Sequence, residues 1–140
     1  MPWRLVLAQH LHIFDKNKIQ KLVIPESVIE IGSEAFSGNE INELVLNNQI
    51  EIISESAFSS NKLKTVKLPE SLKTIGRGAF FSNQITNIKI PNAIEVLQEN
   101  VFYDNKIESI DLNQGLKVIE DFAFAYNLIK KIIIPDTVIE

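Results

Sequence analysis

The sequence predicts an α/β solenoid in which strands outweigh helix, and three observations predict it. Asparagine recurs every 22 residues, at Asn17, Asn39, Asn61, Asn83, Asn105 and Asn127. Aliphatic residues recur two, five, seven and eleven positions after each asparagine, and fourteen positions after the first five. Phenylalanine recurs three positions before it, at Phe14, Phe36, Phe58, Phe80, Phe102 and Phe124. Self-similarity at a fixed period in this range is typical of coils that stack on one another.

The first element expected in each coil is a strand. Residues 64–68 (Lys-Thr-Val-Lys-Leu) alternate polar and apolar side chains, which is the period of a strand with one buried face. Pro69 follows and ends the strand, because proline has no N–H for a ladder. The same position holds Pro25, Asn47, Pro91, Asn113 and Pro135 in the other copies.

The second element is a shorter extended stretch, and the third is a turn. Residues 72–75 are the extended stretch, and Gly76 follows them. We expect a brief helical or 3-10 turn next, as at residues 33–36. An acidic residue near its start suits a helix N-terminus, where unpaired N–H groups favour negative charge; these acids are Glu34, Glu55, Glu99 and Asp121.

Stacking in register brings identical positions together as ladders. Neighbouring coils then lie about 4.8 Å apart, the distance between paired strands. The phenylalanines are expected to form a ladder in the core. The asparagines are expected to point inward, where an amide can both donate to and accept from the backbone groups of the turn.

The repeat resembles a known family. Residues 61–80 read NKLKTVKLPESLKTIGRGAF, with Leu68-Pro69, Ile75-Gly76 and Ala79-Phe80 at the characteristic places. This pattern resembles leucine-rich repeats of the BspA-like subclass, over nearly all of residues 13–140. The resemblance implies a right-handed, curved solenoid with a parallel sheet on its concave face. It also implies a bacterial protein, surface-exposed or secreted, that attaches to host or matrix molecules.

The chain departs from the family pattern at several positions. The unit is one residue shorter than the usual one, and asparagine stands where the family often has cysteine. Gln98 and Glu120 replace the glycine, and Val101 replaces the alanine.

We expect one continuous domain. Residues 1–16, with Trp3 and nearby aliphatic residues, are interpreted as a partial N-terminal cap, and residues 17–140 as 22-residue repeats. The last repeat is expected to be incomplete, since the sequence stops at Val138-Ile139-Glu140, just before the next core isoleucine. Either the chain is a fragment of a longer repeat protein, or its last coil associates with a second copy.

Composition argues against several classes. The net charge of −4 and a pI near 5.2 disfavour a nucleic-acid binder, which usually carries a basic surplus. There is no cysteine, so there are no disulfides and no thiolate metal sites. No window resembles a membrane span, and the short apolar start is too brief for a signal peptide. The compartment therefore stays open, apart from the surface or secreted location that the resemblance implies.

Catalysis, metals and cofactors find no support in the sequence. His10 and His12 are the only histidines, and no third ligand accompanies them. No base is paired with a nucleophile, and no glycine-rich phosphate loop is present. We therefore expect a non-catalytic module that binds a macromolecule, either a protein or a surface component.

Two surfaces are candidates for that binding. The first is the solvent side of the strand row, a face that could otherwise be an ordinary solvated sheet; its candidate residues are Val23, Val45, Lys67, Lys89, Asp111 and Ile133. The second is the last coil, whose apolar edge could join a second copy in a structural or self-assembly role. Its candidate residues are Ile132, Ile133, Ile134, Val138 and Ile139.

Overall fold

The computed structural model describes residues 5–7 and 13–139 as a parallel β-solenoid. It contains short strands and, within those residues, no helix. The strands are β1 (Leu5–Leu7), β2 (Lys21–Val23), β3 (Val28–Ile31), β4 (Glu43–Val45), β5 (Ile52–Ile53), β6 (Thr74–Ile75), β7 (Asn87–Lys89), β8 (Val96–Leu97), β9 (Ser109–Asp111) and β10 (Val118–Ile119).

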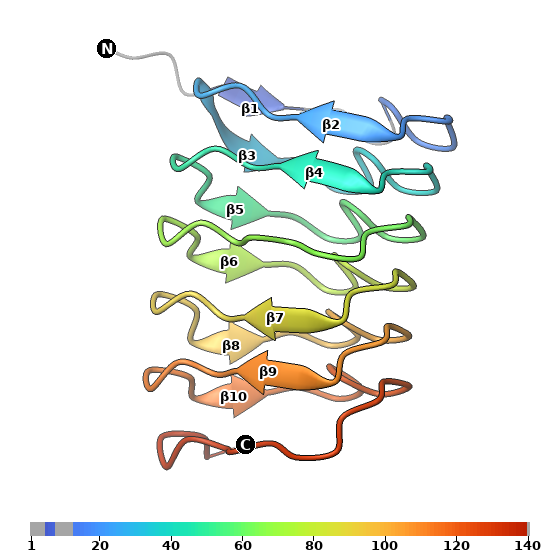
Figure 1. The fold of residues 1–140 in the computed structure, drawn as a ribbon. Coiled ribbons are helices and arrows are strands. Elements are labelled where there is room, and N and C mark those ends of the chain that lie inside the picture. Colours follow the sequence, from blue (N-terminus) through green and yellow to red (C-terminus); the bar gives the residue numbers. More distant parts are fainter. Residues whose placement is uncertain (1–4, 8–12, 140) are drawn as a thin grey trace.

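The strands lie in two rows on opposite sides of the stack (Figure 1). The first strand row, in front, contains β2, β4, β7 and β9, together with residues 65–67 and 131–133, which occupy the same place in their coils. The second strand row, behind, contains β1, β3, β5, β6, β8 and β10. Each coil passes along the first row, turns back along the second row and returns through a loop to the next coil.

The predicted register is confirmed. Leu22 pairs with Leu44, Ile53 with Ile75 and Ile88 with Ile110, so each residue lies beside its counterpart 22 positions away. All strand pairs are parallel. Equivalent positions of the repeat therefore stack on one another from coil to coil.

The phenylalanine ladder is also confirmed. Phe36, Phe58, Phe80 and Phe102 are each at most 1% exposed, and successive rings are 5.6–5.7 Å apart and nearly parallel. The inner asparagines point inward as expected. The Nδ2 group of Asn61 donates to the carbonyl oxygens of Phe36 and Phe58, and its Oδ1 accepts from the N–H of Ile41.

The predicted helical or 3-10 turns are wrong. Residues 33–36 and their counterparts form turns, and the second residue of each turn has a left-handed backbone. These residues are Glu34, Ser56, Gly78, Asn100 and Phe122, with φ between 52° and 59°. A left-handed residue cannot continue a right-handed helix. Each segment is instead closed by two turn hydrogen bonds, as from the N–H of Ala35 to the carbonyl of Gly32 and from the N–H of Ser37 to that of Glu34. The acidic residues therefore do not sit at helix N-termini.

The strand predicted at residues 64–68 is absent, because the first row is interrupted there. β2 pairs with β4 and β7 with β9, but residues 65–67 and 131–133 pair with neither neighbour. Lys67 would lie directly beside Lys89 in a continuous sheet, and like charges at facing positions oppose pairing.

The paired coils share a side-chain clip. Asn47 Nδ2 donates to the carbonyl oxygens of Pro25 and Val28, and Asn113 donates in the same way to those of Pro91 and Ile94. Both asparagines are buried. Pro69 and Pro135 stand at this position in the interrupted coils and offer no such donor. In the first row, strands are thus paired only where an asparagine clips a coil to the preceding one.

The N-terminal segment contributes one strand to the second row. β1 runs parallel to β3, with a shift of register between Leu5 and Val6. The cap proposed for residues 1–16 stays a prediction. Trp3, His10 and His12, which belong to that part of the sequence analysis, lie outside the described residues.

A candidate binding face on the first strand row

The structure places all six predicted binding positions on the solvent side of the first strand row. Val23 is 57% exposed, Val45 is 52% exposed and Ile133 is 75% exposed. Lys67, Lys89 and Asp111 are exposed as well. Between them, Leu22, Val66 and Ile88 turn toward the core, as the two-residue period of an extended chain requires.

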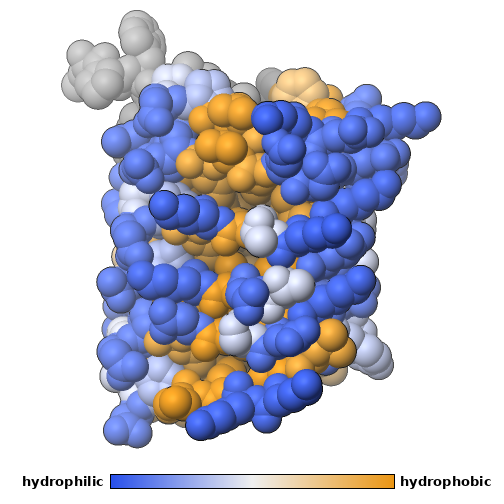
Figure 2. Space-filling model, in the orientation of Figure 1, coloured by the Kyte–Doolittle hydropathy of each residue, from blue (hydrophilic) through white to orange (hydrophobic). Residues whose placement is uncertain are grey.

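The apolar side chains of this face gather at its two ends. Val23 and Val45 lie side by side on the paired strands β2 and β4. Figure 2 shows apolar surface there, in the upper part of the face, and again along the last coil at the bottom. The polar side chains between them separate two small apolar patches of the kind that contacts use.

Ion pairs join some of the charges near the row, whereas others, such as Asp111, form no ion pair with any of the described residues. Lys21 and Glu43 are 2.7 Å apart, and the hydrogen bond and charge of Glu43 raise the pKa of Lys21. Lys89 lies 3.3 Å from Glu70. Lys67 makes no ion pair with any of the described residues. A free positive charge therefore stands at the middle of the face, although the chain as a whole is acidic.

The surface is hollowed where the row is interrupted. The central hollow has a volume of about 460 Å³. It lies along the third coil, and its lining residues are Asn48, Val66, Lys67, Leu68, Pro69, Glu70, Ser71 and Lys89. Apolar side chains form its floor, and the two lysines belong to its rim.

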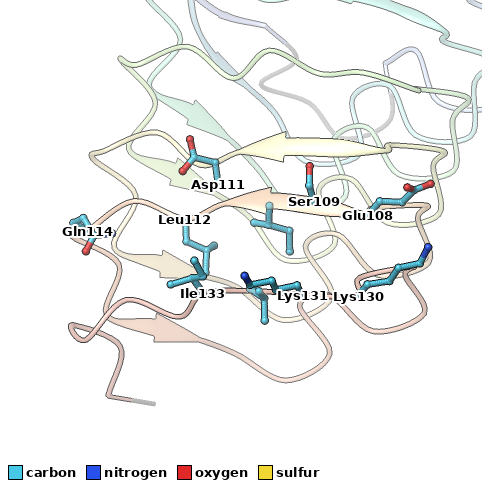
Figure 3. A pocket seen from close by; sticks show the side chains of 10 residues that line it. Glu108, Ser109, Asp111, Leu112, Gln114, Lys130, Lys131 and Ile133 are labelled. Carbon is cyan, nitrogen blue, oxygen red and sulfur yellow. The ribbon is translucent and has the colours of Figure 1, made fainter.

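A second hollow, of about 530 Å³, lies between β9 and the last coil. Figure 3 shows side chains of residues 108–112 on one side and of residues 130–133 on the other. Its charges are mixed, because Glu108 and Asp111 face a surface that also contains Lys130 and Lys131. This hollow adjoins the candidate self-association edge.

The residues of the self-association edge are mostly exposed. The exposed fraction is 38% for Ile132, 75% for Ile133, 47% for Ile134 and 84% for Ile139. Val138 differs, since it is half-buried and packs against the core. The edge is therefore formed by the isoleucines alone.

Other kinds of site find little support. Across residues 5–7 and 13–139 no group of acidic or histidine side chains is arranged to hold a metal ion. A third hollow, of about 350 Å³, is lined by Glu99, Glu120 and Asp121 beside Val118 and Ile119, but Glu120 already accepts a hydrogen bond from the N–H of Glu99. In the same part of the chain, no helix is long and apolar enough to cross a membrane.

Sequence reasoning missed two features. The asparagine clips were visible only as an irregular alternation of Pro and Asn at one position of the repeat. An aromatic cluster was missed as well: Phe81 stacks on Tyr103 at 5.2 Å, and Tyr126 and Phe122 lie at 5.0 Å and 6.5 Å from Tyr103. The 22-residue spacing of Phe81 and Tyr103 could have indicated it.

A stack of repeated coils with an exposed strand face defines a solenoid repeat protein. The chain belongs to the BspA type leucine rich repeat family. The family model, a region of six repeat copies, matches residues 10–129. No curated protein matches the sequence significantly.

Two solved structures are similar to this chain. One is a leucine-rich repeat protein from Bacteroides ovatus, with 24% sequence identity and a TM-score of 0.54, over 86% of this chain and 44% of that chain. The other is a leucine rich cell surface protein from Faecalibacterium prausnitzii, with 18% identity and a TM-score of 0.48, over 86% and 48%. The chain thus spans less than half the length of either protein. The first similarity supports the fold.

Proposed function

We propose that this chain is a non-catalytic module that binds another protein, or a surface macromolecule, through its first strand row. One observation carries the proposal: Val23 and Val45 are more than half exposed and adjacent on paired strands, so together they present an apolar patch to solvent. A rigid sheet face holds such side chains in place at little entropic cost upon binding.

The family resemblance supports this reading. Members of the BspA-like subclass resemble surface or secreted proteins that attach to host or matrix molecules, so adhesion is the role that we propose. Right-handed winding and a concave first strand row, which the resemblance also implies, stay predictions. A concave face would surround a partner on more than one side.

The proposal is tested by selecting peptide ligands from a displayed random library on the wild-type chain. The double variant Val23→Lys with Val45→Lys is expected to weaken the selected ligands about tenfold, equivalent to about 1.4 kcal/mol. Val96→Lys is the matched control, because Val96 is 36% exposed on the second strand row. Ligands that respond to the control and ignore the double variant would place binding elsewhere.

Self-association is a second candidate, favoured by the exposed isoleucines of the last coil. Exposed apolar edges pair with other chains. The variant Ile133→Lys with Ile139→Lys is expected to abolish a concentration-dependent increase in mass seen by sedimentation velocity, while Val23→Lys keeps it. A wild-type chain that remains a single 15.9 kDa species at high concentration would refute this candidate.

A further inference from the structure

All aromatic side chains of the described residues that do not belong to the core ladder gather in one cluster. The chain contains eight phenylalanines, two tyrosines and one tryptophan. Six phenylalanines form the ladder, and Trp3 lies outside the described residues. The aromatic cluster consists of the other four residues, Phe81, Tyr103, Phe122 and Tyr126. They lie on the turns that lead from the second strand row to the next coil, at the right edge of Figure 1.

Tyr103 is the centre of the aromatic cluster. Its ring stacks on that of Phe81 at 5.2 Å, with 7° between the planes. Tyr126 leans against it at 5.0 Å and 49°, and Phe122 meets it edge-on at 6.5 Å. Phe81 and Tyr103 are half-buried, whereas Phe122 is 61% and Tyr126 is 74% exposed. Two rings held in place by the others therefore present most of their surface to solvent.

The backbone at the two exposed rings is unfavourable for aromatic residues. Phe122 and Tyr126 have left-handed backbones, with φ of 59° and 55°. In the second coil the same positions are Ser56 and Ser60, and a bulky side chain makes this conformation more costly. Ser60 is exposed although coils lie on both sides of it, so this position faces away from the stack. Costly backbone conformations are typical of ligand-binding sites, and two exposed aromatic residues in such a conformation indicate one.

The turns around the aromatic cluster are acidic. Four acidic residues and one basic residue occur in residues 76–83, 98–105 and 120–127. The basic residue, Arg77, already pairs with Glu99 at 3.3 Å. Asp104 and Asp121 are exposed and form no ion pair with any of the described residues. The negative charge at this edge of the molecule is therefore largely uncompensated.

One of these carboxylates lies close to the central ring. Burial raises the pKa of Tyr103, and the hydroxyl of Tyr126 and the charge of Asp104 add to the rise. The hydroxyl of Ser82 donates to Asp104 at 2.9 Å and holds that carboxylate in place. Aromatic ring faces also carry partial negative charge and attract cations that lie within about 6 Å of the ring centre. Rings and carboxylates together thus favour a positively charged occupant.

We propose that the aromatic cluster is a docking site for an arginine-containing, basic segment of a partner protein. A guanidinium lies over the exposed rings of Phe122 and Tyr126, and a second basic group pairs with Asp104. Arginine suits the rings better than lysine, because its guanidinium is planar and weakly hydrated and stacks on aromatic faces. The cluster extends over three coils, about 10 Å at the spacing of paired strands, so an extended segment spans it and a single small cation does not. This site lies apart from the first strand row and goes beyond the proposed function.

The probe for this site is a peptide of alternating arginine and glycine, added to the whole chain with ¹³C in its tyrosine rings. Both tyrosines of the chain belong to the cluster, so every labelled signal reports on this site. The ring signals are expected to shift as the peptide binds. A glutamate–glycine peptide is expected to leave them unchanged, and a lysine–glycine peptide is expected to bind several-fold more weakly.

The test variant is Phe122→Ser with Tyr126→Ser, which is expected to weaken binding of the fluorescent arginine peptide about tenfold by anisotropy. Circular dichroism should show that this variant folds, because Ser56 and Ser60 occupy the same positions in the second coil. Leu128→Ser is the matched control, since Leu128 is 54% exposed and follows the cluster in the chain without belonging to it. The control and the ring-preserving variant Tyr126→Phe are each expected to change binding by less than about twofold.

The role of charge is tested separately. Asp104→Asn keeps an oxygen that can accept from Ser82 and removes the negative charge. It is expected to weaken binding of the arginine peptide about two- to fivefold. An unchanged affinity would overturn the pairing of a basic group with Asp104.

Several other results would overturn the inference: no shift of the tyrosine ring signals, equal loss with Leu128→Ser, or an unchanged affinity in the double serine variant. Equal shifts with tetramethylammonium chloride would indicate a site for small cations, and equal shifts with maltoheptaose a site for neutral sugars. If the arginine peptide responds only to Val23→Lys with Val45→Lys, it binds at the first strand row. That result would overturn this inference and leave the proposed function standing.

Discussion

At the scale of single residues, the inward asparagines hold the turns of adjacent coils together. Asn83 Nδ2 donates to the carbonyl oxygens of Phe58, Phe80 and Phe81, and its Oδ1 accepts from the N–H of Leu63. Asn83 is 7% exposed, so these backbone groups have little access to water. One amide thereby satisfies polar groups from both its own coil and the preceding one.

Removing that amide is expected to be expensive. Asn83→Ala should lower the free energy of unfolding by about 3 kcal/mol, because a buried donor and several acceptors lose their partner. The measurement is urea unfolding followed by circular dichroism. The matched variant is Asn17→Ala, since Asn17 is exposed and, among the described residues, donates only to the carbonyl of Asp15. A similar loss in both variants would show that burial does not set the cost.

Left-handed residues are a second feature of this scale. Ser60 has a φ of 54°, in the left-handed region, and its side chain is exposed. Ser60→Gly is therefore expected to raise the free energy of unfolding by about 1 kcal/mol, because glycine adopts this conformation without steric cost. Ser33→Gly, at a position without positive φ, should lower the free energy of unfolding by about 0.5–1 kcal/mol. Thermal unfolding of the two variants compares them, and shifts of the same sign would contradict the assignment.

At the scale of elements, the strand pairs of the first row coincide with the asparagine clips. Asn113 connects its coil to the coil of β7, and Asn47 connects its coil to that of β2. A clip fixes the separation of two coils at the end of the strand. Strand pairing then costs less chain entropy, since one end of the ladder is already closed.

Amide exchange tests this coupling. The N–H of Ile90 donates to the carbonyl oxygen of Asp111. Asn113→Ala should increase the hydrogen-exchange rate of this amide about tenfold, and that of the Ile24 amide by less. Asn47→Ala should do the reverse, so each variant serves as the control for the other. Equal acceleration at both amides in both variants would indicate a general loss of stability instead.

These elements also show what sequence reasoning could and could not supply. The alternation of polar and apolar residues at 64–68 correctly predicts which side chains face the core: Val66 is buried, and its neighbours Thr65 and Lys67 are exposed. Pairing failed because it depends on residues 22 positions away, among them Lys89 and Asn47. The outward placement of the six candidate positions was predicted correctly, and their role in binding stays a prediction. The hollows were not predicted, because they arise where coils separate.

At the scale of the whole molecule, stability depends on position in the stack. Phe80 has a ring on each side, at 5.6 Å, and is fully buried. Among the described residues, Phe14 stacks only on Phe36, and it is 39% exposed. In a solenoid each coil contacts only its neighbours, so an inner coil contributes two interfaces to stability.

Truncation of the ladder should reveal this gradient. Phe80→Ala is expected to lower the free energy of unfolding by about 3–5 kcal/mol, because the stack cannot collapse into the cavity. Phe14→Ala should cost about half as much or less, since part of its ring already faces water. Urea unfolding of both variants measures the two free energies of unfolding. Equal decreases would show that the cost of truncation does not depend on position in the stack.

The sequence by itself determined the period, the register, the phenylalanine and asparagine ladders and the outward positions of the first strand row. It could do so because stacking repeats each local choice in every coil, which makes the pattern readable from the chain alone. Only the tertiary structure decided that each turn contains a left-handed residue, and that the first row is paired at two interfaces between coils and unpaired at the other three. It also decided that Lys67 forms no ion pair with any described residue. Those outcomes depend on the contacts between one particular coil and the next. Like charges, prolines and amide side chains at that interface decide whether the two coils pair, and these contacts cannot be read from one repeat alone.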